Sequence, residues 1–465
     1  MRRDLDLYLP VMLAGACAMA VEIAGARIIA PYLGNTIYTW SAVIGFVLAA
    51  LSVGYFYGGK LGDKYGDEKH LSYIFIIAAA CTIGIPFLAI IFVPMTVVLE
   101  IIPASIISSL ILVPAGFFYG MVTPYAIKLT TSKGEEGRSA GNIFAISTIG
   151  SIFGVLLTGF LLIPNIFLSH VFILAAVLML VSGWLINRKQ ITPIEIMVFI
   201  VGSLLISGIS YSPSFEGTVI HQENSEYYLV SVMEIEGGRL LLLDRALETG
   251  EKDGEPIFKY VKKTKIAYEL LDNPENALVL GVGGGTHVED LKEEFPEIEV
   301  DGVEIDASVI KVGKEFFSLK DERTTIIIDD ARRYVLNSDK RYDVIIVDVY
   351  RGTTMPYHLS SLEFVKEMKE DLKEDGVIVT NIISSLEGEK SKRFELFYNT
   401  FNHEFENVLT IPTNDKPTEI QNILVIATDG NVNEFKEKHY LYEREITDDR
   451  IVTDEWNPMD VMVAQ

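Results

Sequence analysis

The chain has 465 residues, 49% of them hydrophobic, and carries 39 Lys and Arg against 63 Asp and Glu, a formal charge of −24. This length exceeds one ordinary soluble domain, so we expect at least two parts. The acidic balance argues against nucleic acid as a partner, because phosphate backbones are bound by surfaces rich in Lys and Arg. A content of two cysteines excludes a disulfide scaffold.

The first 210 residues carry the hydrophobicity rather than the charge. They hold 11 Lys and Arg against 10 Asp and Glu, which leaves 28 against 53 for the rest of the chain. Apolar runs of about 20 residues, the length that crosses a bilayer, recur throughout them. We therefore predict an all-α transmembrane bundle over 1–211, a multi-pass unit of the cell membrane. Its expected helices lie near 7–30, 38–58, 71–94, 103–127, 139–162, 167–187 and 192–210.

Basic residues in the loops of this bundle predict its orientation. They all fall on one side of the layout, and the opposite loops, near 31–37, 95–102 and 163–166, contain neither Lys nor Arg. The basic side is expected to face the cytoplasm. Seven crossings would then place the acidic part of the chain outside the cell. If the segment 192–210 lies in the interface instead, the acidic part stays inside, and the sequence leaves both alternatives open.

Residues 212–270 have the pattern of a small β-domain. Residues 227–243 are rich in Tyr, Val, Leu and Ile around Gly237 and Gly238, which predicts a β-hairpin. A short turn region at 249–256 is expected to precede a helical stretch near 257–271.

Residues 271–440 alternate apolar runs of strand length with charged amphipathic stretches. This alternation predicts a parallel sheet with crossover helices, a doubly wound Rossmann-like α/β fold similar to S-adenosylmethionine methyltransferases. Runs at 408–411 and 420–427 are expected to complete the sheet as an antiparallel edge, and 441–465 forms an acidic tail without an assigned role. The expected parallel strands are 277–280, 300–305, 325–328, 344–347 and 377–381.

A glycine loop follows the first of these strands. Its sequence is GVGGGT, with Gly281, Gly283 and Gly285 placed for a tight turn and for close approach of a ligand to the next helix. The dinucleotide pattern G-x-G-x-x-G would have glycine where Thr286 stands. This difference favours an S-adenosyl-type ligand over a pyrophosphate cofactor.

Acidic residues end the next three strands, where ligands of such sheets bind. Glu304, beside Ile305, stands 23 residues after Gly281, and a carboxylate there can accept hydrogen bonds from both ribose hydroxyls. Asp330 precedes the small Ala331, which leaves room for an adenine ring, and the acid can accept a hydrogen bond from the adenine amino group. Asp348 ends the fourth strand, where a carboxylate can accept a proton from an attacking amine or attract a cationic substrate.

Taken in this order, the motifs resemble those of the spermidine synthase family (polyamine aminopropyltransferases). The likeness covers most of 222–385 and continues through the run MPYHLSSLEF at 355–364. The hydrophobic helices ahead of it resemble the membrane-fused class of that family. The resemblance implies transfer of an aminopropyl group from decarboxylated S-adenosylmethionine, the co-substrate, to a small-molecule amine such as putrescine, with release of 5′-methylthioadenosine.

The same resemblance implies roles for individual residues. Asp348 matches the catalytic proton acceptor. The nucleoside donor is expected to contact Gly281, Gly283, Gly285, Glu304, Ile305, Asp330, Ala331 and Pro356, and the amine to contact Tyr227, Glu248, Tyr350, Arg351 and His358. No metal is expected, the lipid bilayer is an expected partner, and a homodimer is left open. Supply of the donor favours a cytoplasmic position for this domain.

Some positions depart from the family pattern. Arg351 stands where soluble members have a second amine-binding Asp, Thr286 replaces an Asp after the glycines, and Glu248 replaces a Gln. Arg351 would repel a diammonium chain in the cleft, unless it pairs with Glu248 or Asp253. Three hypotheses therefore stay open: an aminopropyltransferase, an S-adenosylmethionine-dependent methyltransferase on a membrane-delivered acceptor, and a transporter or sensor that binds an adenosyl ligand without turnover.

Overall fold

A computed structural model of the chain describes residues 2–33, 37–96, 98–99, 101–131, 136–187, 217–253, 255–350, 352, 355–443 and 449–459. The chain divides into two compact units. One comprises Met1–Pro213 with Asn224–Glu226, and the other comprises Ser214–Glu223 with Tyr227–Gln465. Each unit has a hydrophobic core of its own.

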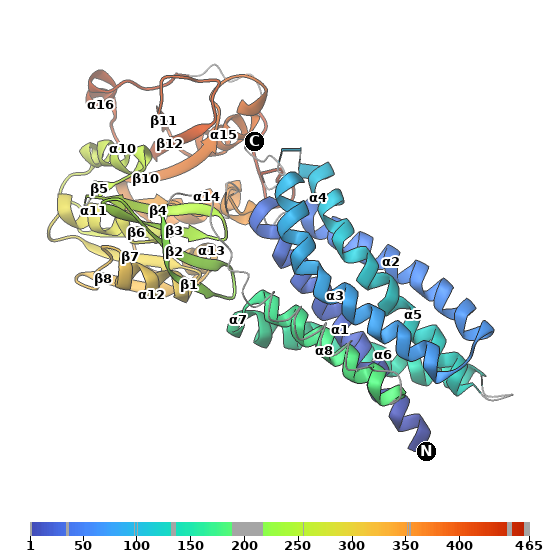
Figure 1. The fold of residues 1–465 in the computed structure, drawn as a ribbon. Coiled ribbons are helices and arrows are strands. Elements are labelled where there is room, and N and C mark those ends of the chain that lie inside the picture. Colours follow the sequence, from blue (N-terminus) through green and yellow to red (C-terminus); the bar gives the residue numbers. More distant parts are fainter. Residues whose placement is uncertain are drawn as a thin grey trace. The chain divides into compact units, whose positions relative to one another are not determined.

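The first unit is helical (Figure 1). Within the described residues, six spans have the length and apolar composition to cross a membrane, and they match the first six predicted segments. The predicted segment 192–210 lies outside the described residues. The helices are α1 (Arg2–Leu33), α2 (Ile37–Lys64), α3 (Glu68–Thr96), α4 (Ile101–Ser109), η1 (Leu110–Leu112), α5 (Val113–Thr130), α6 (Glu136–Leu157), η2 (Thr158–Leu162), α7 (Ile163–Asn165) and α8 (Leu168–Ile186).

Glycines allow the helices of this unit to pack closely. A Cβ atom at Gly54 of α2 would lie 2.2 Å from the carbonyl oxygen of Phe117 on α5. A Cβ atom at Gly150 of α6 would lie 2.0 Å from the carbonyl oxygen of Met12 on α1. Small residues at such crossings are typical of helices that associate within a membrane, where backbone contact replaces the hydrophobic effect as the source of affinity.

The second unit begins with a five-stranded antiparallel sheet. Its strands lie in chain order: β1 (Thr218–Asn224), β2 (Leu229–Ile235), β3 (Gly238–Leu243), β4 (Ala246–Lys252) and β5 (Glu255–Pro256). The predicted hairpin is β2–β3, whose turn contains Gly237 at φ +81°. The predicted turn region 249–256 is instead partly strand, because β4 continues through Thr249, which pairs with Leu241 of β3. The helix α10 (Lys259–Ala267) and the turn η3 (Tyr268–Leu270) follow.

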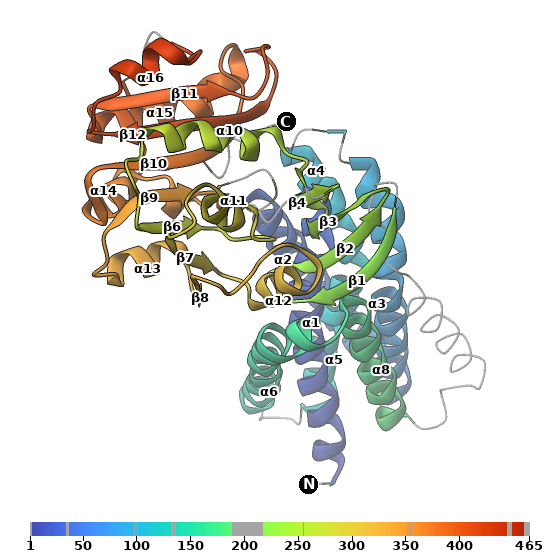
Figure 2. The ribbon, with the colours of Figure 1, turned by 90° about the vertical axis from the view of Figure 1, so that its left-hand side faces the viewer.

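A seven-stranded sheet forms the rest of this unit and confirms the predicted doubly wound fold. Its order is β11-β12-β10-β9-β6-β7-β8, which Figure 2 shows from one edge to the other. The five strands from β10 to β8 are parallel, as expected from the alternating pattern. The strands are β6 (Asn276–Leu280), β7 (Glu299–Glu304), β8 (Thr324–Ile328), β9 (Tyr342–Val347), β10 (Leu372–Ser384), β11 (Asn407–Pro412) and β12 (Gln421–Thr428).

The helices of this unit connect the strands. Their bounds are α11 (Thr286–Glu294), α12 (Ala307–Phe316), α13 (Ala331–Asn337), η4 (Tyr357–Leu359), α14 (Leu362–Glu370), η5 (Glu389–Ser391), α15 (Lys392–Glu404) and α16 (Asn433–Lys438). The chain leaves β6 towards β7 on one side and returns to β9 on the other side of β6. Ligands of open α/β sheets bind at such a reversal, outside the carboxyl ends of the strands.

Two features differ from the expected pattern. The strand β12 is antiparallel and lies between β10 and β11, so β11 is the edge strand and runs in the same direction as β10. The described part of the tail, 449–459, contributes to the core, because Val452 and Met459 are fully buried. The carbonyl oxygen of Val452 accepts a hydrogen bond of 2.8 Å from the backbone N–H of Leu362, at the start of α14.

Candidate active site

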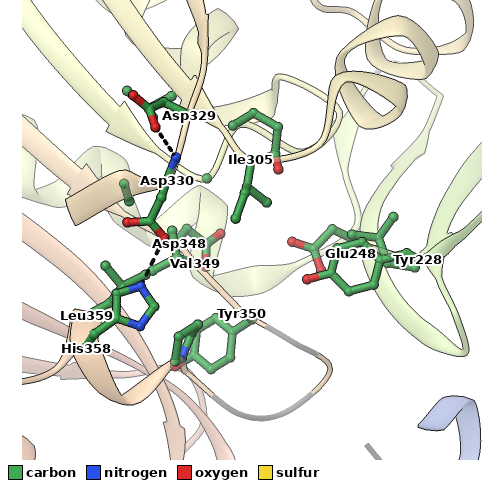
Figure 3. Close-up of a pocket in the computed structure, with 16 residues that line it drawn as sticks. Tyr228, Glu248, Ile305, Asp329, Asp330, Asp348, Val349, Tyr350, His358 and Leu359 are labelled. Carbon is green, nitrogen blue, oxygen red and sulfur yellow. Dashed lines mark hydrogen bonds and ion pairs between the residues drawn. The ribbon is translucent and has the colours of Figure 1, made fainter. Parts of the chain in front are cut away.

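A cleft with an empty volume of about 560 Å³ lies at the carboxyl ends of β6, β7, β8 and β9. Figure 3 shows Tyr228 and Glu248 from the small sheet reaching into the cleft opposite Asp330, Asp348 and His358. The lining residues are Tyr228, Leu243, Glu248, Gly281, Val303, Glu304, Ile305, Asp329, Asp330, Ala331, Asp348, Val349, Tyr350, Pro356, His358 and Leu359.

The glycine loop brings the ends of β6 and β9 together. A Cβ atom at Gly281 would lie 2.1 Å from the carbonyl oxygen of Asp348, and Gly281 has φ +84°, so only glycine fits there. Gly283 lines a second cavity rather than the cleft. Gly285, with φ +94°, caps α11 and packs against Leu319, and it lines neither cavity.

Glu304 ties the glycine loop to the end of β7. Its Oε2 accepts hydrogen bonds from the backbone N–H groups of Val282 (3.1 Å) and Gly283 (3.2 Å), and its Oε1 accepts one from Asp306 (3.2 Å). Burial raises the pKa of this carboxyl group, and the backbone hydrogen bonds oppose that rise. Since a carboxylate has about four lone-pair directions, one remains for a ligand.

Asp330 caps the helix α13 and also faces the cleft. Its Oδ1 accepts hydrogen bonds from the backbone N–H groups of Arg332 (3.0 Å) and Arg333 (3.1 Å). Its Oδ2 lies 3.0 Å from Nε2 of His358, and this contact holds the pKa of Asp330 below its usual range. His358, expected at the substrate, therefore forms one wall of the cleft by pairing with Asp330.

Asp348 is oriented by three segments of the chain. Its Oδ2 accepts a hydrogen bond of 2.8 Å from the hydroxyl of Tyr260 on α10 and lies 3.3 Å from Nε2 of His287 on α11. Its Oδ1 accepts a hydrogen bond of 3.0 Å from the side-chain amide of Asn381 on β10. None of these three partners was an expected site residue. Asn381 alone carried a signal, because it is the last residue of a predicted strand.

The second cavity lies on the other side of the Asp348 carboxylate. It has an empty volume of about 360 Å³ and shares Glu248, Gly281 and Asp348 with the cleft. Tyr260 and His287 also line it. Asp348 is therefore placed at the junction of two cavities, one bounded by Glu304 and Asp330 and the other by aromatic rings.

Negative charge gathers at this junction. The pKa of Glu248 lies well above its ordinary value because of burial and because of the negative charges of Asp348 and Glu304. Each of these carboxylates destabilises the ionised form of Glu248. A cationic ligand would relieve this repulsion, so the site favours positively charged molecules.

The remaining predicted residues fall in different places. Tyr350 and Pro356 line the cleft, and the Tyr350 hydroxyl donates a 2.8 Å hydrogen bond to the carbonyl oxygen of Asn381. Tyr227 is not among the lining residues, whereas its neighbour Tyr228 is. Arg351 lies outside the described residues.

The chain is similar in sequence to known proteins. A family profile described as the spermine/spermidine synthase domain matches residues 262–432. A polyamine aminopropyltransferase of Vibrio vulnificus is 31% identical over 208 residues, which are 42% of this chain and 68% of that protein. The chain belongs to the polyamine aminopropyltransferase family, which confirms the resemblance seen in the sequence.

Other relatives extend this comparison. A probable polyamine aminopropyl transferase of Bifidobacterium longum is 30% identical over 44% of this chain, and the match spans only 47% of that relative. Polyamine aminopropyltransferase 2 of Aquifex aeolicus is 24% identical over 80% of this chain and 78% of its own length. Among solved structures, the spermidine synthase of Thermotoga maritima has 21% identity and a TM-score of 0.40, covering 53% of this chain and 84% of that one.

Proposed function

We propose that this family member is a membrane-integrated enzyme that transfers an aminopropyl group from decarboxylated S-adenosylmethionine to an amine such as putrescine. The by-product would be 5′-methylthioadenosine. The observation that carries the proposal is the position of Asp348, a well-oriented carboxylate at the junction of two cavities. One cavity suits a nucleoside, and the other suits a cationic acceptor.

The cleft fits the nucleoside part of the donor. Glu304 retains one lone-pair direction for a ribose hydroxyl. Among the described residues Oδ2 of Asp330 has one partner, His358, which leaves a lone pair for an adenine amino group. Ala331 and Pro356 add small apolar surface to the same cleft. These contacts would hold the sulfonium end of the donor towards Asp348.

The reaction would then need alignment and one proton transfer. The acceptor nitrogen uses its lone pair to form a bond with the propyl carbon, while the bond from that carbon to sulfur breaks and its electrons remain on sulfur as a neutral thioether. Asp348 takes the proton that the nitrogen loses. Alignment of this kind supplies on the order of 7–11 kcal/mol, and the acidic junction would stabilise the positive charge that develops on the attacking nitrogen.

The second cavity is the proposed acceptor site. Glu248 and Asp348 both line it, so an ammonium group there meets two carboxylates. Phe258 and Tyr260 provide apolar surface for a carbon chain. This combination suits an amine with an aliphatic segment.

The test is incubation of the purified full-length chain with decarboxylated S-adenosylmethionine or S-adenosylmethionine and a panel of amines. Mass detection of 5′-methylthioadenosine with an aminopropylated product is the expected result. Formation of S-adenosylhomocysteine would contradict the proposal and favour methyl transfer. A nucleoside that raises the melting temperature without any turnover would instead favour a non-catalytic sensor or transporter.

A further inference from the structure

His287 is a buried histidine beside the proposed base. It is 6% exposed and lies in the first turn of α11, directly after the glycine loop. Its Nε2 lies 3.3 Å from Oδ2 of Asp348, and its ring lies 6.0 Å from that of Tyr260. Among the described residues its other nitrogen, Nδ1, has no hydrogen-bond partner. A buried nitrogen without a partner is costly unless it has a role.

Asp290 lies one helical turn after His287 and is also 6% exposed. Its Oδ1 lies 3.3 Å from Nζ of Lys265, and within the described chain its Oδ2 has no hydrogen-bond partner. Residues three apart on a helix face the same side. A positive charge on His287 lowers the pKa of Asp290, so the two side chains interact electrostatically.

The two groups without partners can be joined by one proton. In the tautomer with its proton on Nδ1, His287 can donate through one buried water to Oδ2 of Asp290, and the lone pair of Nε2 faces Asp348. When Asp348 is protonated, it can donate to that lone pair. With a second proton on Nε2, the imidazolium would then donate towards a carboxylate on each side.

The geometry points to His287 as a relay that passes the reaction proton from Asp348 towards Asp290 and the surface. This inference rests on the proposed transfer reaction. In that reaction an acceptor ammonium and a sulfonium become a secondary ammonium and a neutral thioether, so one proton is released in each turnover. Asp348 would pass that proton to the lone pair of Nε2 of His287, Nδ1 would release its proton through the water to Asp290, and a turn of the ring would restore the starting tautomer. Solvent would take the proton beside Lys265 and Glu293, whose side chains reach the surface.

Other charged groups around His287 are consistent with this direction. Tyr260 holds its own proton firmly, because burial and the charges of Asp348 and Glu248 raise its pKa well above the ordinary value. Glu248 lines the same cavity but faces the proposed substrates. Burial raises the pKa of Asp290 despite the opposing charge of Lys265, which suits a group that holds a proton briefly.

The first test compares His287→Gln with wild type in the aminopropyl-transfer assay. Glutamine can still donate a hydrogen bond to Asp348 but cannot carry a proton. We expect kcat to fall about 10- to 100-fold, less than the roughly 10²- to 10⁴-fold contribution of a direct acid–base group. The solvent isotope effect on kcat should increase, and imidazole should restore part of the activity of His287→Ala. His403→Gln, an exposed histidine on α15, is the matched control and should behave as wild type.

Either of two results would overturn the relay. One is a His287→Gln variant with wild-type kcat and pH profile. The other is a loss of kcat that leaves the isotope effect unchanged and that imidazole does not restore, since this indicates a packing role alone.

A second test needs no turnover. Nitrogen-15 signals of the His287 ring report its protonated fraction, which should fall in Asp290→Asn at neutral pH, because the carboxylate that stabilises the imidazolium is gone. Unchanged signals would overturn the relay even if the enzyme is active. If wild type transfers nothing but these signals change as expected, the proposed function fails and the proton path stands.

Discussion

The carboxylate of Asp348 has a hydrogen bond on each oxygen, from Tyr260 on one and from Asn381 on the other. These contacts keep one orientation towards both cavities, as a general base requires. We expect Asp348→Asn to lower kcat by about 10²- to 10⁴-fold, because the amide cannot accept the proton. Binding of 5′-methylthioadenosine should persist, since the other cleft contacts remain. Steady-state kinetics and calorimetry measure these two quantities.

Asp339→Asn is the control for this substitution. Asp339 is exposed, lies between α13 and β9, and is absent from both cavities. The variant should keep wild-type kcat. Full activity in Asp348→Asn would show that Asp348 is not the proton acceptor.

Glu248 gives a prediction on stability that follows from its charge. Its pKa in the folded chain is raised above the ordinary value, so its ionisation costs stability once the pH exceeds the unfolded pKa. Glu248→Gln should therefore raise the melting temperature of the ligand-free protein at about pH 8 and have little effect near pH 4. The shift amounts to about 2–4 °C for each kcal/mol gained.

The same substitution should weaken amine binding. The KM for the acceptor is expected to rise about tenfold, or 1.4 kcal/mol, because one of two carboxylates at the ammonium is lost. Thermal melts and acceptor titrations measure the two effects. A lower melting temperature at both pH values would contradict the inferred charge repulsion.

Strand ends alone mark some of the site residues, whereas Glu248, Pro356 and His358 were expected from the family resemblance. Glu304 ends β7, and Asp330 and Asp348 follow β8 and β9, so alternating strands and helices place all three on one edge of the sheet. Asn381 could have been found by the same rule. His287 and Tyr260 could not, because each sits in a charged helix, and their contacts with Asp348 join residues 61 and 88 positions apart.

Hydrogen bonds join the described tail residues 449–459 to α13 and to the segment around η4, beside the cleft. The Arg332 guanidinium pairs with Asp454 of the tail at 2.7 and 2.8 Å and donates to the carbonyl oxygen of His358 at 3.2 Å. Asn457 donates to the carbonyl oxygen of Tyr357 at 2.6 Å. Since His358 contacts Asp330, the tail supports the wall where adenine is proposed to bind.

We expect Asp454→Asn to weaken binding of 5′-methylthioadenosine about tenfold, or 1.4 kcal/mol, with little change in kcat. The pair is well shielded on its Arg332 side, which is 14% exposed, so its loss is felt more than that of an exposed pair. Glu419→Gln, which breaks the exposed pair with Lys416, is the control and should have no effect. Equal affinity of both variants for 5′-methylthioadenosine would show that the hydrogen bonds of the tail do not support the site.

The bounds of an element differ from the sequence pattern where pairing with a distant strand determines its first residue. The strand β10 begins at Leu372, five residues before the predicted run, because Leu372 pairs with Tyr342 ahead of a register shift. The intervening Glu-Asp-Gly residues resemble a loop, and Asp375 indeed has φ +59°. The tail was likewise expected only as an acidic segment. Val452 and Met459 nevertheless belong to the hydrophobic core, which the local sequence does not indicate.

Composition alone separates an apolar first part of the sequence from an acidic second part, and the structure has two units with six apolar spans among the described residues of the first. Composition cannot determine on which side of the membrane the catalytic unit lies. The donor carries a sulfonium charge, and charge crosses hydrocarbon only at high cost. We therefore expect the catalytic unit to face the cytoplasm, where the donor is made.

A cysteine-labelling experiment tests this placement. Cys17 and Cys81 are the only cysteines of the sequence, so their replacement by alanine gives a background for single new thiols. Asp415→Cys, at an exposed position between β11 and β12, should react with a membrane-impermeant maleimide only after the cells are permeabilised. Labelling of Asp415→Cys in intact cells would place the catalytic unit outside, and its donor would then have to be exported.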